Sequence, residues 1–96
     1  MATIVHSSRS LAHLEQTFEL LSRDNPAAIA AADAIRSAVQ SLAAHPLLGR
    51  RVHGDIRELV ISHGQTGYVA LYRFVVPKDE VRVLALRHQR DVGFVP

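Results

Sequence analysis

The chain has 96 residues, of which 48% are hydrophobic and 21% are charged, and its formal net charge at pH 7 is +2. This length fits one domain with a modest core, and the composition is too apolar for a disordered tail. The absence of cysteine excludes a disulfide scaffold and a thiol nucleophile, and no apolar run reaches the ~18 residues of a membrane span. We therefore expect one cytoplasmic domain over residues 1–96, without a secretory signal or a membrane segment.

The first half of the chain predicts a strand followed by a capped helix. Residues 3–6 are short and β-branched, as strands are. Ser7 and Ser8 can cap a helix, because their hydroxyls accept hydrogen bonds from the free amides of its first turn. Apolar residues then recur at steps of three and four and form one helical stripe, comprising Leu11, Leu14, Phe18 and Leu21.

A second helix should follow after a short break. Asn25 can cap it, and Pro26 suits its first position, where no amide donor is needed. His45 and Pro46 should end it. Its apolar stripe consists of Ala28, Ala32, Ile35, Val39 and Leu42. Because the link between the helices is so short, we expect an antiparallel helix hairpin.

The second half predicts three strands, over residues 56–62, 68–76 and 81–88. Residues 47–51 precede them as an exposed connector with an apolar anchor and a basic tip. The links at 63–67 and 77–79 are short, so the strands should form an antiparallel meander. The order β-α-α-β-β-β predicts an α+β fold in which the helix hairpin packs on a small antiparallel sheet.

The middle strand is apolar on both sides, although a helix hairpin can cover only one face of a sheet. Two interpretations explain this pattern. A partner chain could cover the other face, or the connector and the C-terminal residues could fold over it.

Arginine dominates the charge of the second half. Residues 49–96 hold seven Arg and one Lys against five acids, a balance of +3, whereas residues 1–48 hold three Arg against four acids. Arginine suits phosphate and carboxylate partners, although a GC-rich genome would also favour it. The candidate anion-binding residues are Arg50, Arg51, Arg57, Arg73, Arg82, Arg87 and Arg90.

Two of these arginines interrupt apolar strands, where an unpaired charge is costly. Arg57 and Arg73 should therefore either pair with Glu58, Asp55 or Asp91 or face a groove that receives an anion. Other chemistry has less support. Gly64 and Gly67 belong to a turn that no helix follows, and the six histidines lack metal-ligand spacing, so we expect no cofactor and no metal site.

Three segments, residues 57–60, 67–74 and 81–91, together resemble the RelE/ParE toxins of bacterial type II toxin–antitoxin (plasmid stabilisation) modules. Residues 47–50 fit the segment before the family's second strand, and the predicted order of elements fits the family fold. The resemblance implies a cognate antitoxin from the same operon, and contact with operator DNA only through that antitoxin. By analogy, the antitoxin-binding residues would be Leu47, Leu48, Leu59, Tyr72 and Phe74.

The family divides into two activities. RelE-like members cut mRNA on the ribosome, which would make Arg57, Arg73 and Arg87 phosphate-binding residues and His88 a catalytic acid or base. ParE-like members inhibit DNA gyrase by binding and need no nuclease residues. Phe94 stands where many relatives carry a tyrosine, and a phenyl ring cannot transfer a proton. We therefore expect a gyrase inhibitor that is not an enzyme, with an mRNA interferase or a degenerate, non-toxic binding module as the alternatives.

Overall fold

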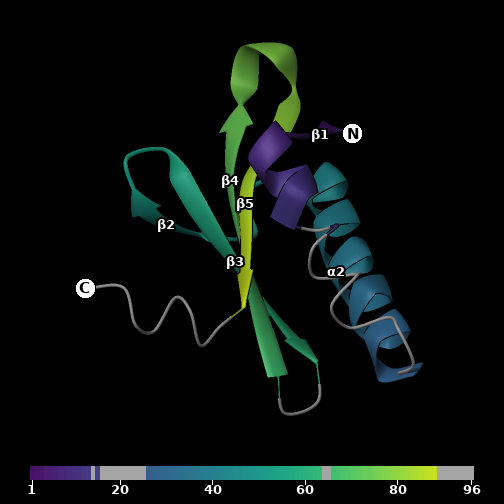
Figure 1. The fold of residues 1–96 in the computed structure, drawn as a ribbon. Coiled ribbons are helices and arrows are strands. Elements are labelled where there is room, and N and C mark those ends of the chain that lie inside the picture. Colours follow the sequence, from purple (N-terminus) through teal and green to yellow (C-terminus); the bar gives the residue numbers. More distant parts are fainter. Residues whose placement is uncertain (14, 16–25, 64–65, 89–96) are drawn as a thin grey trace.

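The computed structural model describes residues 1–13, 15, 26–63 and 66–88. Its elements are β1 (Thr3–His6), α2 (Pro26–Ala44), β2 (Arg50–His53), β3 (Ile56–His63), β4 (Thr66–Val75), a 3₁₀ turn (Val76–Lys78) and β5 (Glu80–His88). Residues 8–13 and residue 15 are also helical. The expected α+β architecture is confirmed, with α2 packed along a five-stranded sheet (Figure 1).

The sheet has the strand order β1-β5-β4-β3-β2. β1 pairs with β5 in parallel, and the other neighbours are antiparallel. The expected meander of three strands is present as β3, β4 and β5. The expected β-α-α-β-β-β order is incomplete, because part of the connector, Arg50–His53, forms the additional edge strand β2. This strand turns into β3 at Gly54, which has a left-handed φ of 56°.

The stripe of α2 packs against one face of the sheet. Ile35, Val39 and Leu42 are buried, and Leu42 has no exposed surface. They join a core to which the sheet contributes Leu59, Ile61, Tyr68, Ala70, Tyr72, Val81, Val83 and Leu86. The predicted helix limits are confirmed, since α2 begins at Pro26 and ends before His45 and Pro46. Among the described residues, no helix combines the length and apolar character needed to cross a lipid bilayer.

The first helix is capped as its sequence predicts, because the Ser10 amide donates to the Ser7 hydroxyl at 3.0 Å. Its apolar stripe fits less well. Leu11 is 44% exposed, whereas the polar Ser10 is buried. Leu14, Phe18 and Leu21 lie outside the described residues, as does the proposed cap Asn25. Burial of His6 on the adjacent β1 lowers the pKa of its imidazole.

β5 contains a bulge, which the first helix binds. Tyr72 pairs with Val83 and Leu71 pairs with Ala85, so Leu84 is an extra residue without a partner in β4. The Ser7 hydroxyl donates to the Leu84 carbonyl at 2.9 Å, and the Leu86 amide donates to Nδ1 of His13 at 3.3 Å. The first helix thus satisfies backbone groups of β5 beyond Val83, where the pairing with β1 ends.

The face of the sheet away from α2 is partly closed. Val69 and Ala85 project from it, and both are buried. Val60 on the same face is 50% exposed. Part of the second apolar face expected from β4 is therefore buried within the chain, and part of it, at Val60, is exposed.

Candidate anion-binding site

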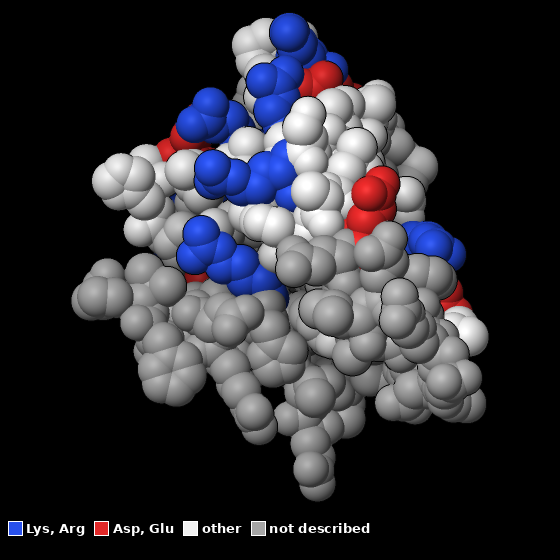
Figure 2. Space-filling model, in the orientation of Figure 1, with Lys and Arg blue, Asp and Glu red and all other residues white. Residues whose placement is uncertain are grey.

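Carboxylates neutralise three of the predicted anion-binding arginines. The ion pairs are Arg50–Glu58 (3.0 Å), Arg73–Asp55 (3.2 Å) and Arg82–Glu80 (2.8 Å). Figure 2 shows Lys and Arg side chains in a column over the central strands, with acidic side chains beside several of them. Where a guanidinium group is already paired with a carboxylate, an incoming anion has to compete with that carboxylate.

Arg73 illustrates this group, and of the two alternatives left open by the sequence the structure shows an ion pair with Asp55. Its Nε lies 3.2 Å from Oδ2 of Asp55, but the geometry does not make a hydrogen bond, which leaves this buried nitrogen unsatisfied. The two side chains are 42% and 64% exposed. Water therefore screens most of the attraction between them.

The Arg73→Ala substitution should accordingly cost little stability. We expect a loss below about 1 kcal/mol, as for exposed ion pairs, rather than the ~3–5 kcal/mol of a broken buried pair. Urea denaturation measures the loss. Arg82→Ala is the matched control, because Arg82 is equally exposed but its partner Glu80 is only 17% exposed, so its loss should be larger. A loss near 3 kcal/mol for Arg73→Ala would contradict this interpretation.

Arg51 and Arg57 differ from these three. They occupy opposing positions on β2 and β3 and project from the face of the sheet that α2 covers. Among the described residues, neither pairs with a carboxylate. Arg51 donates through Nε to the Gly54 carbonyl at 3.1 Å. Two adjacent like charges bound only to neutral carbonyls favour the approach of an anion.

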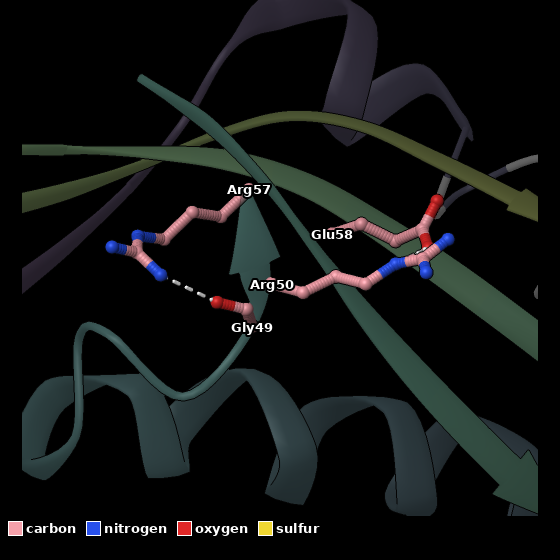
Figure 3. A network of polar contacts seen from close by, with 4 residues as sticks. All are labelled: Gly49, Arg50, Arg57 and Glu58. Atoms are coloured by element: carbon pink, nitrogen blue, oxygen red, sulfur yellow. Dashed lines mark hydrogen bonds and ion pairs between the residues drawn. The ribbon is translucent and has the colours of Figure 1, made fainter. Parts of the chain in front are cut away.

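Arg57 is tied to the connector that precedes β2. Its Nη1 donates to the Gly49 carbonyl at 2.7 Å and, at 3.4 Å, to that of Leu47. Figure 3 shows Arg57 extending toward Gly49, while Arg50 extends the opposite way toward Glu58. Of the two alternatives for Arg57, the carboxylate partner is not found among the described residues, where Arg57 binds backbone oxygens instead.

Tyr72 fixes the same connector from beneath. Its side chain is fully buried, and its hydroxyl donates to the Pro46 carbonyl at 2.9 Å while accepting from the Gly49 amide at 2.8 Å. Burial raises the pKa of Tyr72, although the Gly49 hydrogen bond and the charge of Arg57 act in the opposite direction. The phenol is thus protonated at neutral pH and able to donate.

The predicted antitoxin-binding residues lie in different environments. Leu47 and Leu48 are 61% and 56% exposed. Leu59 and Tyr72 are core residues, and Phe74 is partly buried against the core. The prediction that Leu59 and Tyr72 offer surface to a partner is therefore wrong, because α2 and the connector cover that side of the sheet.

The C-terminal candidates are only partly described. Arg87 opposes Val69 on the face away from α2, so it lies on the other side of the sheet from Arg57. His88 ends β5, but its side chain is outside the described residues, as are Arg90, Asp91 and Phe94. In the described part of the chain, no group of His, Cys, Asp or Glu side chains is placed to hold a metal ion.

Sequence reasoning missed the roles of Pro46, Gly49 and β2 in shaping this site. The sequence Gly54-Asp55 between two short polar and apolar stretches was the available signal, since glycine and aspartate are typical of hairpin turns. No comparable signal exists for the connector. Its shape depends on Tyr72, which lies 23 residues from Gly49 in the sequence.

Known proteins resemble this chain in sequence. A family model described as "ParE toxin of type II toxin-antitoxin system, parDE" matches residues 4–93. Toxin RelE3 of Caulobacter vibrioides is 45% identical over 72 residues, which cover 75% of this chain and 76% of that protein.

Solved structures share the fold at low sequence identity. The chromosomal ParDE toxin–antitoxin system from P. aeruginosa contains a chain with a TM-score of 0.70 at 18% identity, covering 92% of this chain and 96% of that one. The intact E. coli RelBE toxin–antitoxin complex contains one with a TM-score of 0.64 at 13% identity, covering 91% and 95%. At this identity the likeness establishes the fold alone.

Proposed function

This chain belongs to the ParE toxin family of type II toxin–antitoxin systems, and we propose that it acts as a binding inhibitor of DNA gyrase. The family match over residues 4–93 supports the ParE branch. The observation that carries the proposal is the chemistry around Arg57. The guanidinium group of Arg57 donates a hydrogen bond to the backbone carbonyl of Gly49. The buried hydroxyl of Tyr72 already donates to the carbonyl of Pro46. Such a site can bind anions, but its described groups offer no free acid or base.

A cognate antitoxin is the second part of the proposal. Both structural relatives described above come from toxin–antitoxin systems. We propose that this chain likewise binds a small antitoxin in the bacterial cytoplasm, and that Leu47 and Leu48 contribute exposed apolar surface to that contact.

Expression of the chain alone should arrest growth with induction of the DNA-damage response. Purified protein should inhibit supercoiling by gyrase, and primer extension should show no new codon-specific mRNA ends. His88→Ala should leave toxicity nearly intact, because a binding inhibitor does not need an imidazole for proton transfer. An enzyme that lost its general acid or base would instead slow by ~10²–10⁴-fold.

An mRNA interferase remains the second candidate, because the 45% identical relative carries a RelE name. Codon-specific cuts that disappear in His88→Ala would favour it and would contradict gyrase inhibition. In that case His88 would be the acid or base, with Arg57, Arg73 and Arg87 on the phosphate.

A further inference from the structure

Polar side chains attach the first helix to two strands of the sheet. The Ser7 hydroxyl donates to the backbone of β5 at the bulge, and Nδ1 of His13 accepts from the Leu86 amide at 3.3 Å. On the neighbouring strand β1, Nδ1 of His6 lies 3.2 Å from Oγ of Ser10, which is 1% exposed. Figure 1 shows this helix in purple, beside β5. Two of the three contacts therefore involve an imidazole.

The contact between His13 and Leu86 requires a neutral imidazole. A backbone amide can only donate, so Nδ1 of His13 must carry a free lone pair, and the ring proton must be on Nε2. A charged imidazole has a proton on both nitrogens and cannot accept. It would repel the amide hydrogen of Leu86, a residue that is 6% exposed, and leave this donor without its partner. Protonation of His13 is therefore incompatible with the contact.

His6 is also held in its neutral form, in this case by burial. Burial lowers the pKa of His6 from its usual value of 6.5. When the helix leaves the sheet, the ring becomes exposed and binds a proton more readily than it does in the attached state. The stability that neutral His6 contributes is thus complete above pH 6.5 and is lost as the pH falls through the lowered pKa.

Other charges near these rings act on them only weakly. Glu15 on the first helix and Arg36 on α2 line the same cavity as His6, whereas β5 lines it with aliphatic side chains. Glu15 is exposed, and the Arg36 side chain is 70% exposed and paired with Asp33, so water screens both charges. On β5, Arg87 follows the residue that binds His13 but lies on the face away from α2. The pH response should therefore come from the imidazoles themselves.

We propose that the attachment of the first helix to β5 is controlled by pH: the helix stays on the bulge while His6 and His13 are neutral and detaches when they take up protons. Detachment uncovers the apolar side chains of Val83 and Leu86, which line the cavity beside the helix. The pairing of β3 with β4 does not use these two histidines, so the change is local. The inference does not depend on the target of the toxin, and its test is separate from any toxicity assay.

Hydrogen exchange of the full chain, followed by NMR at about pH 7.5 and about pH 5.5, tests the proposal. The protection factor of the Leu86 amide, corrected for the pH dependence of exchange itself, should fall roughly tenfold or more at the lower pH. An exposed imidazole with a pKa of about 6.5 is then protonated about ten times more often than not. Amides paired between β3 and β4 should keep their protection.

Asparagine variants assign the response to the two histidines. Asparagine has a carbonyl oxygen that can accept in place of Nδ1, and it does not titrate. The double variant His6→Asn/His13→Asn should therefore show the same Leu86 protection at both pH values. His53→Asn is the matched control on the exposed strand β2 and should keep the full response. Ring ¹⁵N signals of the parent chain give a readout without substitution, because His13 should be neutral with its proton on Nε2 at the higher pH.

Four results would overturn this proposal. The first is equal protection of Leu86 at both pH values in the parent chain, and the second is an undiminished response in the double variant. The third is an equal loss of protection between β3 and β4, which would indicate acid unfolding of the whole domain. The fourth is loss of the response in Glu15→Gln, which would assign it to a carboxylate.

Discussion

The Gly49→Ala substitution is expected to lower the free energy of unfolding by about 3 kcal/mol, at the upper end for overpacking a close contact. The added Cβ would lie 2.7 Å from the Glu58 carbonyl oxygen and 2.9 Å from the Tyr72 hydroxyl. Neither neighbour can move easily, because Glu58 contributes backbone from β3 and Tyr72 is fully buried. The methyl group would push the connector outward and break the hydrogen bonds of Tyr72.

Gly54→Ala is the matched control for this change. A Cβ on Gly54 meets no atom within 4 Å, but its φ of 56° is left-handed, so the cost should be about 1–2 kcal/mol from backbone strain alone. Thermal and urea denaturation of both variants compare the two costs. If Gly49→Ala proved no worse than Gly54→Ala, the close packing of the connector would be unimportant for stability.

Truncating Leu42 should have a comparably large effect on α2. Leu42 has no exposed surface and packs where α2 meets the sheet, so Leu42→Ala should cost about 3 kcal/mol in lost burial and residual cavity. A domain of this size has ~5–10 kcal/mol of stability in total, so the variant should unfold well below the melting temperature of the parent chain.

Ile29→Ala is the control within the same helix. Ile29 is 55% exposed, so this change should alter stability by less than about 0.5 kcal/mol. Calorimetry or circular dichroism on heating would measure both variants. Equal losses would mean that α2 does not pack on the sheet as the structure shows.

Elements with a strong local signal were predictable from the sequence. Pro26 and the Ala-rich run after it mark the start of α2, and the apolar spacing identifies the face that packs on the sheet. The strands β3 to β5 have long apolar stretches separated by short links. In each case the element can be predicted from residues that are close together in the sequence.

β2 was missed because it carries no burial signal. All four of its residues are exposed, and Val52 is its only strongly β-forming residue. Its pairing with β3 depends on the register between segments, and this register sets Arg51 opposite Arg57. The candidate site was therefore only partly predictable. The arginines are visible in the sequence, but their partners are chosen by tertiary contacts, such as the backbone carbonyl of Gly49 for Arg57.

The bulge at Leu84 changes which side chains of β5 face the core. Val81 and Val83 lie on the core side of the sheet, and strict alternation would continue with Ala85 and Arg87. The extra residue instead turns Leu86 into the core and Arg87 to the opposite face. Without it, a guanidinium would point at the apolar underside of the helices and a leucine would face outward. The side chains of Ser7 and His13 bind the backbone of β5 at this bulge, which places the positive charge of Arg87 on the face away from α2.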